Sequence, residues 1–176
     1  MATPVFIIGY MACGKTTLGR ALARELGREF IDLDFYIEQR FRRRISEIFA
    51  TDGEGEFRRM EGAMLREVGE MSDVVVACGG GTPCQGDNMD YMLSRGLVVY
   101  LSTSVERIVE RLRANRKRRP LMAEKSDDEL RAAVEAGLAS RRECYERAHV
   151  VQDGYYLEDK RQIAGTVREL VSIINY

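Results

Sequence analysis

Apolar residues in this chain follow two alternating patterns. Short, unbroken apolar runs predict buried strands at residues 5–8, 74–77, 97–101 and 150–151, and residues 30–34 predict another short strand that ends in two carboxylates. Between them, apolar residues recur at helical spacing and predict helices at residues 17–26, 35–41, 45–50, 57–68, 89–93, 105–112, 127–148 and 157–174, with Ser104 as a cap. Alternating strands and helices are typical of a parallel sheet with helices on both faces, so we predict a three-layer α/β/α fold with a five-stranded parallel sheet.

Length, charge and composition restrict the class of protein. The 176 residues are 45% hydrophobic and contain no repeat or linker, so we expect a single domain over residues 1–176. A net charge of −1 gives no reason to expect nucleic acid or an anionic membrane as a partner. The chain has no basic leader and no stretch of 18 apolar residues. We therefore expect a soluble, cytoplasmic monomer.

The loop after the first predicted strand carries the strongest chemical signal. Residues 9–16 fit the pattern G-x-x-x-x-G-K-[ST], and a helix is predicted directly behind them. Backbone N–H groups and a helix N-terminus there favour an anion, Lys15 can reach the β and γ phosphates, and the Thr16 hydroxyl can bind Mg²⁺. The pattern predicts ATP or GTP as ligand, against the alternative of a glycine-rich turn that binds nothing. The expected nucleotide-binding residues of the loop are Gly9, Ala12, Cys13, Gly14, Lys15, Thr16 and Thr17.

Two further groups of residues follow predicted strands. Asp32 and Asp34 end the second strand, and residues 79–81 are three glycines after the third. Because ligands of parallel sheets bind beyond the carboxyl ends of the strands, both groups should meet the phosphate loop at one site. Alternatively, the carboxylates are a solvated turn and the glycines a turn that needs positive φ.

Six blocks of this sequence resemble the shikimate kinases, a branch of the phosphate-loop proteins similar to nucleoside monophosphate kinases. They occur in the family's order over nearly the whole chain, at residues 8–20, 30–34, 53–61, 79–81, 119–121 and 141–145. The resemblance implies a P-loop NTPase fold with a mobile lid at about 115–125. It also implies ATP-dependent phosphorylation of the 3-hydroxyl of shikimate in the chorismate pathway to aromatic amino acids.

The resemblance also implies roles for the site residues. Arg58 and Arg141 would hold the substrate carboxylate, which suits the bidentate guanidinium fork, and Glu61 could orient Arg58 by an i,i+3 pair. Asp34 would orient the attacking hydroxyl and accept its proton, and Asp32 would support Mg²⁺ from the outer shell. The shikimate ring would lie against Gly79, Gly80 and Gly81. The alternative interpretation of Arg58 is a solvent-exposed residue of a helix.

The basic segment 116–119 is the expected lid. Arg119 would reach the transferring phosphoryl group, and Arg113 would stack on adenine. A solvated loop and a nucleic-acid patch are alternative interpretations, although the segment has no interleaved aromatic residues. The single histidine and four cysteines form no zinc pattern. Cys13 lies at a helix N-terminus beside Lys15, which favours a thiolate that thiol reagents attack and MgATP protects, against the alternative of a buried and inert thiol.

Two other functions stay open at this stage. A gluconate or nucleotide kinase would share the architecture, although Arg58, the triple glycine and Arg141 together favour shikimate. A regulatory nucleotide-binding module would keep Lys15 but would need neither Asp34 nor an arginine in the lid. Turnover with a panel of acceptors separates these functions.

Overall fold

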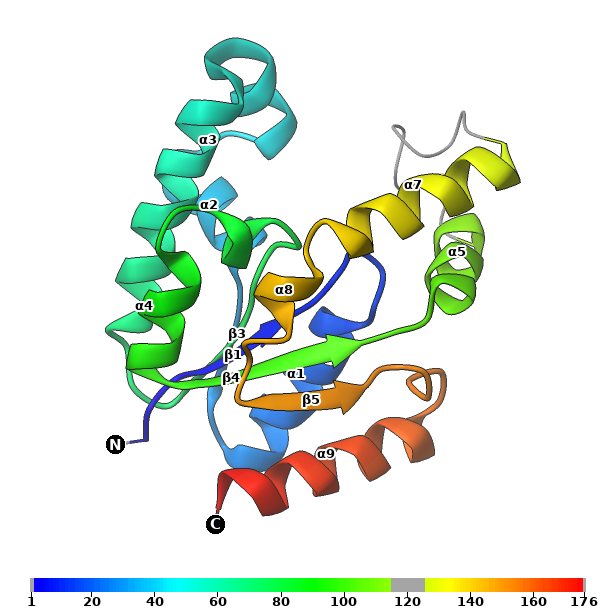
Figure 1. Cartoon of the computed structure of the whole chain (residues 1–176). Helices are drawn as coiled ribbons and strands as arrows, with labels where there is room; N and C mark the ends of the chain where they lie inside the picture. Colours follow the sequence, from blue (N-terminus) through cyan, green and yellow to red (C-terminus); the bar gives the residue numbers. More distant parts are fainter. Residues whose placement is uncertain (1, 115–125, 176) are drawn as a thin grey trace.

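The computed structural model describes residues 2–114 and 126–175 (Figure 1). Its sheet has five strands, all parallel, in the order β2-β3-β1-β4-β5. The strands are β1 (Val5–Ile8), β2 (Glu29–Asp32), β3 (Val74–Ala77), β4 (Leu97–Ser102) and β5 (Val150–Asp153). The predicted five-stranded parallel sheet is therefore confirmed.

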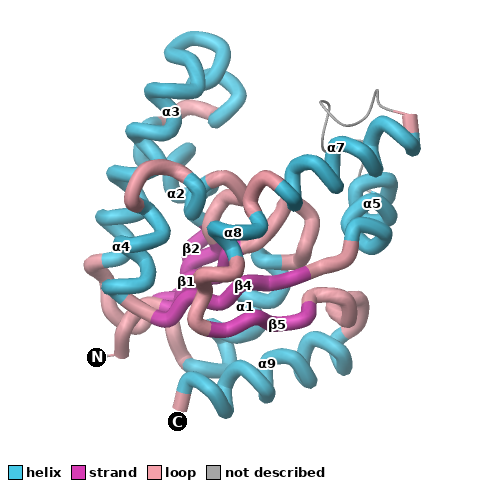
Figure 2. Tube along the Cα trace, in the orientation of Figure 1, coloured by secondary structure: helices cyan, strands magenta, loops and turns pink. Residues whose placement is uncertain are grey.

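Helices cover both faces of the sheet and make the three expected layers (Figure 2). Alternate residues of β1 pack on opposite faces of the sheet. Val5 and Ile7 pack toward α1 and α9, whereas Phe6 and Ile8 pack toward the opposite layer. The helices are α1 (Lys15–Leu26), α2 (Leu33–Phe41), α3 (Ile45–Gly69), η1 (Thr82–Cys84), α4 (Asn88–Arg95), α5 (Val105–Ala114), α7 (Asp127–Ala139), α8 (Arg142–Tyr145) and α9 (Lys160–Ile174).

The second strand is shorter than predicted. It ends at Asp32, and α2 begins at Leu33, so Asp34 lies in the first turn of a helix. Asp32 caps that helix, because its side chain accepts a 3.4 Å hydrogen bond from the Phe35 amide. The expectation that Asp34 ends a strand is wrong, yet both carboxylates stay at the carboxyl edge of the sheet.

The two helices predicted at 45–50 and 57–68 are the two parts of one kinked helix, α3. Gly53 interrupts the helical geometry between them with φ 81° and ψ 172°, so a break exists where the sequence pattern placed one. The kinked α3 carries Arg58 just beyond that break. At the start of α5 the predicted cap is confirmed, since Ser104 Oγ accepts a 3.3 Å hydrogen bond from the Arg107 amide.

The single helix predicted at 127–148 is wrong. Helix α7 ends at Ala139, and α8 begins at Arg142 after a turn. The apolar pattern hides this break, because Val134 and Tyr145 are separated by nearly a whole number of helical turns and would share one face of a straight helix. No helix in the described ranges is both long enough and apolar enough to cross a bilayer.

Candidate active site

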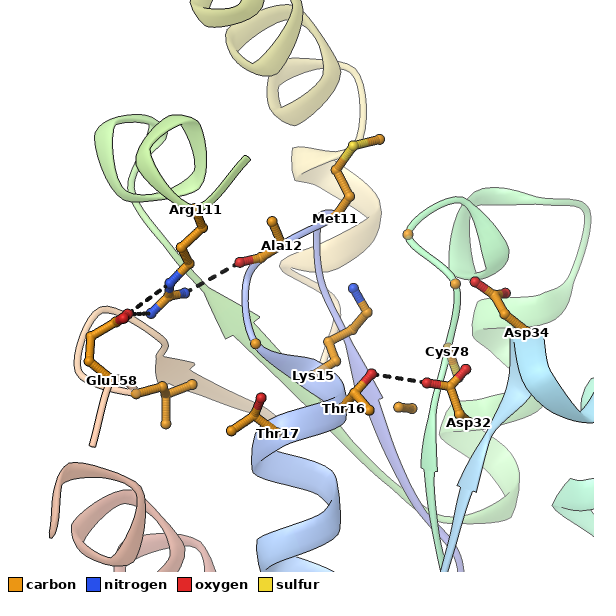
Figure 3. A pocket seen from close by; sticks show the side chains of 15 residues that line it. Met11, Ala12, Lys15, Thr16, Thr17, Asp32, Asp34, Cys78, Arg111 and Glu158 are labelled. Carbon is orange, nitrogen blue, oxygen red and sulfur yellow. Dashed lines mark hydrogen bonds and ion pairs between the residues drawn. The ribbon is translucent and has the colours of Figure 1, made fainter. Parts of the chain in front are cut away.

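The phosphate loop joins β1 to α1 and leaves the α1 N-terminus open to a pocket of about 650 Å³ (Figure 3). Gly9 and Gly14 have φ values of 146° and 109°, which L side chains rarely adopt. A Cβ on Gly9 would also stand 2.7 Å from the Leu101 carbonyl oxygen. The glycines of the motif are thus required by both backbone conformation and space.

Lys15 occupies the middle of this pocket (Figure 3). Its Nζ donates hydrogen bonds of 2.9 Å to the carbonyl oxygens of both Gly9 and Tyr10. These bonds hold the ammonium group over the loop, where an anion between the loop and the α1 N-terminus would meet both a full positive charge and the helix dipole.

Thr16 and Asp32 lie together at the base of the pocket. Thr16 Oγ1 donates a 2.9 Å hydrogen bond to Asp32 Oδ2. The pair presents oxygen ligands only, which suits a hard cation such as Mg²⁺. Within residues 2–114 and 126–175 no group of three or more His, Cys, Asp or Glu residues could hold a metal by itself. A cation at this pair would therefore depend on further oxygen ligands, which nucleotide phosphates supply.

Asp34 lies across the pocket from Arg111 and Glu158 (Figure 3). Its carboxyl is accessible from the pocket but has protein on most sides, which removes it from water. This desolvation is the main cause that raises the pKa of Asp34 to about 6. The negative charges of Asp32 and Glu61 raise it further, and Lys15 opposes them. A carboxylate with this pKa is mostly ionised at neutral pH and binds a proton more tightly than an ordinary Asp.

The glycine turn after β3 is the point where three polar side chains meet. A Cβ on Gly79 would stand 2.9 Å from Asp34 Oδ1, and one on Gly81 would stand 2.9 Å from Arg58 Nη2. A Cβ on Gly80 would lie 3.6 Å from Arg141 Nη1. None of these glycines is among the described residues with positive φ. The alternative of a turn that needs positive φ is therefore excluded, and close approach of side chains explains the glycines.

Two buried contacts fix this turn in place. The Tyr145 hydroxyl donates a 2.5 Å hydrogen bond to the Gly80 carbonyl. The Glu61 carboxylate, only 1% exposed, accepts 2.6 Å and 2.8 Å hydrogen bonds from Thr82 Oγ1 and Arg58 Nη1. The expected i,i+3 pair of Arg58 and Glu61 is confirmed. Arg58 also donates to Glu54, with 3.2 Å between Nη2 and Oε1, so its guanidinium is held on two sides.

Comparison with known proteins agrees with this geometry. Residues 11–172 match the family model described as shikimate kinase. The shikimate kinase of Bacteroides fragilis is 45% identical over 171 residues, covering 97% of this chain and 96% of its own length. The chain belongs to the shikimate kinase family.

Two solved structures of this family superpose closely on the model. The crystal structure of shikimate kinase from Bacteroides thetaiotaomicron has a TM-score of 0.95 and 41% identity, and covers 99% of each chain. The enzyme from Acinetobacter baumannii, in complex with shikimate, has a TM-score of 0.85 and 32% identity. That match covers 99% of this chain and 93% of the other. The P-loop kinase fold expected from the sequence is confirmed by these shikimate kinases.

Sequence reasoning missed Arg111. This side chain is 14% exposed, and its Nη1 donates a 2.9 Å hydrogen bond to the Cys13 carbonyl in the phosphate loop. Its Nη2 donates to the Gly154 carbonyl at 3.0 Å and to Glu158 Oε1 at 2.7 Å. Arg111 therefore joins the nucleotide loop of this shikimate kinase to the segment after β5. The available signal was its place on the buried face of α5, beside the apolar residues Ile108 and Leu112.

Of the two arginines expected near the nucleotide, the structure describes one. Arg113 does not line the 650 Å³ pocket, and its Nε lies 2.9 Å from Asp127 Oδ1 in an exposed ion pair. Stacking of Arg113 on adenine stays a prediction. Arg119 and the rest of the expected lid at 115–125 lie outside the described residues.

Two of the four cysteines of this shikimate kinase, Cys13 and Cys78, are buried, and Cys84 and Cys144 are half-buried. Cys13 is 0% exposed, with its Sγ 3.8 Å from Lys15 Nζ, and this burial opposes the expected attack by thiol reagents. Burial raises the pKa of Cys78 far above its usual range and, with the neighbouring Cys84, raises that of Cys144 to about 12. His149 packs at the sheet edge and accepts a 3.1 Å hydrogen bond from the Val98 amide.

Proposed function

We propose that this chain transfers the γ-phosphoryl group of ATP to the 3-hydroxyl of shikimate, giving shikimate 3-phosphate and ADP in the pathway to chorismate. The observation that carries the proposal is the convergence of Asp34, Arg58 and Arg141 on one glycine turn beside the phosphate loop. Family membership and the similar enzyme that holds shikimate support it. A purely regulatory nucleotide switch would need neither the arginine pair nor Asp34.

The phosphate loop and Lys15 supply the nucleotide side of the reaction. Phosphoryl transfer needs positioning and charge neutralisation more than covalent catalysis. Backbone N–H groups of the loop would hold the phosphate oxygens, and Lys15 Nζ, now on the Gly9 and Tyr10 carbonyls, is placed to turn onto the β and γ phosphates. Because this movement is short, the ammonium charge would stay near the bond that breaks.

Thr16 and Asp32 are the residues that would hold Mg²⁺. The Thr16 hydroxyl would be the direct ligand, and Asp32, already hydrogen-bonded to it, would orient that hydroxyl from the outer shell. When bound, Mg²⁺ neutralises charge on the phosphate oxygens. This pairing explains why a hydroxyl at the start of α1 and a carboxylate at the end of β2 lie together.

Asp34 would orient the acceptor hydroxyl and take its proton. A pKa of about 6 leaves it ionised at neutral pH while making it a better proton acceptor than an ordinary aspartate. Its place against Gly79 puts the carboxylate at the edge of the turn that would face the ring hydroxyls.

Arg58 and Arg141 would bind the carboxylate of shikimate. They come from α3 and from the turn between α7 and α8, and they reach Gly81 and Gly80 respectively. Two guanidinium groups from different elements can hold a carboxylate in one orientation, which presents the 3-hydroxyl to Asp34. The backbone of Gly79, Gly80 and Gly81 would lie against the ring.

Two further arginines, one before the expected lid and one within it, would complete the nucleotide site. Arg113 would stack on adenine, and Arg119 would meet the transferring phosphoryl group. We further propose that the chain acts as a monomer in the cytoplasm, without nucleic acid or membrane partners, in line with its net charge of −1.

One coupled assay tests the proposal. ADP release should depend on both shikimate and Mg²⁺, because the acceptor completes a site that otherwise excludes water. Gluconate and a nucleoside monophosphate serve as alternative acceptors in the same assay. Equal ATP consumption without shikimate, or a clear preference for another acceptor, contradicts the proposed function.

A further inference from the structure

The two arginines of the acceptor site are held by different kinds of partner. Arg58 donates hydrogen bonds to the carboxylates of Glu54 and Glu61. Arg141 forms no ion pair with any carboxylate in the described part of the chain. Its guanidinium carbon instead lies 5.2 Å from the centre of the Tyr10 ring, and it also interacts with the Tyr145 hydroxyl. Arg58 also lies 5.2 Å from the centre of the Phe57 ring, so both arginines have an aromatic neighbour, and the difference between them is the pair of carboxylates at Arg58.

Tyr10 is a residue of the phosphate loop, the second position of the G-x-x-x-x-G-K-[ST] pattern. Its side chain is only 4% exposed and extends from the loop to α7. There its hydroxyl lies 3.5 Å from the Ala133 carbonyl oxygen, and a Cβ on Gly137 would stand 2.3 Å from the same hydroxyl. The ring is thus fixed between the nucleotide loop on one side and α7 on the other.

We propose that Tyr10 is a positioning residue of the acceptor site, whose ring orients Arg141 for the substrate carboxylate and ties that arginine to the phosphate loop. The inference rests on the proposed function. It adds a residue of the nucleotide motif to the machinery that selects the acceptor.

The physical reason lies in what each partner does to the arginine charge. A carboxylate partner orients a guanidinium but neutralises much of its charge, as Glu54 and Glu61 do for Arg58. An aromatic face attracts the same cation through its quadrupole and carries no net charge. Arg141 thereby keeps its charge and its N–H donors for a ligand, which makes it the stronger of the two arginines for an incoming carboxylate.

The position of Tyr10 has a second consequence. Gly80, which Arg141 faces, also lies against the phosphate loop, since a Cβ there would be 3.4 Å from the Gly9 carbonyl oxygen. Any shift of the loop that moves the Tyr10 ring moves the support of Arg141 as well. The nucleotide and acceptor sites therefore share a packed contact.

The experiment compares Tyr10→Leu with Tyr10→Phe in the full chain. Phenylalanine keeps the aromatic face, so its KM for shikimate should stay within about twofold of wild type. Leucine removes the face, and the KM for shikimate should rise about 3- to 30-fold, while the KM for ATP changes less than about twofold. Tyr91→Leu is the matched control, because Tyr91 packs under Arg66 in the same way, at 5.1 Å, away from the pocket.

A second variant moves the ring without removing it. Gly137→Ala places a methyl group against the Tyr10 hydroxyl and should raise the KM for shikimate in the same direction as Tyr10→Leu. A double-mutant cycle of Tyr10→Leu with Arg141→Lys should be clearly non-additive in shikimate KM. Thermal unfolding of each variant separates these effects from a loss of fold.

Two outcomes overturn the inference. One is an unchanged shikimate KM in Tyr10→Leu. The other is an equal rise of the KM values for ATP and shikimate, which would mean that Tyr10 only shapes the phosphate loop. Failure of the proposed function is distinguished from both, because wild type itself would then show no shikimate-dependent turnover.

Discussion

Gly79 lies so close to Asp34 that a Cβ on the glycine would stand 2.9 Å from the Asp34 Oδ1 atom. The same turn approaches Arg58 equally closely through Gly81. Since neither glycine has positive φ, an alanine could adopt the backbone conformation of the turn. The glycines are therefore needed for the space that they leave to functional side chains.

This relationship predicts the effect of Gly81→Ala and Gly79→Ala. The added methyl group should push Arg58 or Asp34 out of place, at a cost of about 1–3 kcal/mol, and lower kcat/KM for shikimate about tenfold or more. Steady-state kinetics measure the effect. Gly165→Ala, at a helical position with nothing within 4 Å of the new Cβ, is the control and should behave like wild type. Normal kinetics in Gly81→Ala would contradict the close-approach explanation.

The raised pKa of Asp34 predicts a pH profile. If the Asp34 carboxylate accepts the proton of the acceptor hydroxyl, kcat/KM should fall below a pH of about 6, tenfold per pH unit, and level off above it. Rates with shikimate between pH 5 and 8 measure this profile. A flat profile across that interval would exclude Asp34 as the proton acceptor.

The same pKa has a consequence for stability. The folded-state pKa of about 6 exceeds the ordinary value of 3.8, so the folded protein binds this proton more tightly, and its stability falls as pH rises from about 4 to about 6. Asp34→Asn should therefore be inactive but, above pH 6, more stable than wild type by on the order of 1 kcal/mol, a value reduced for solvent screening at this accessible group. Thermal unfolding at pH 4 and pH 8 checks the sign, and Asp153→Asn is the surface control.

The arginine pair gives a third prediction. Arg58→Ala and Arg141→Ala should each weaken shikimate binding by about 2–5 kcal/mol, because each removes a bidentate partner of a desolvated carboxylate. Lysine should rescue poorly, since it lacks the fork. The KM for ATP should change little in the same assays. Arg59→Ala is the matched control, because Arg59 is exposed and, in the part of the chain that the structure describes, its ion pair is with Glu56 on the same helix. An unaltered shikimate KM in both variants would refute the clamp.

The fold and most of the site could be predicted from sequence, for a physical reason. Buried parallel strands are continuous apolar runs, and a phosphate loop needs fixed glycines, so both leave strong local signals. The break between α7 and α8 leaves none, because it depends on the contact of Tyr145 with Gly80, far away in the chain. The structural reason for the three glycines likewise leaves no local signal, since close approach depends on side chains from other elements.

The expected lid gives a fourth prediction, at residues outside the described ranges. If Arg119 meets charge mainly in the transition state, Arg119→Ala should lower kcat about 10² to 10⁴-fold while the shikimate KM moves much less. Arg118→Ala is its neighbouring control and should stay close to wild type. Should both variants keep kcat within about threefold of wild type, or lower it equally, the segment acts as a solvated loop or a diffuse basic patch.

Arg111 and Arg113 are close in sequence but should behave in opposite ways. Arg111→Ala removes the guanidinium hydrogen bonds to the Cys13 and Gly154 carbonyls, so we expect a loss of about 2–4 kcal/mol in unfolding free energy together with a raised KM for ATP. Among the described residues, Arg113→Ala breaks an exposed ion pair with Asp127, so its unfolding free energy should change by about 0.5 kcal/mol or less. Chemical denaturation and ATP kinetics on both variants separate the two roles. If Arg113 stacks on adenine, its variant raises the KM for ATP at unchanged stability. If neither variant alters the KM for ATP, other residues hold adenine, and Arg111 contributes to the stability of the fold without affecting nucleotide binding.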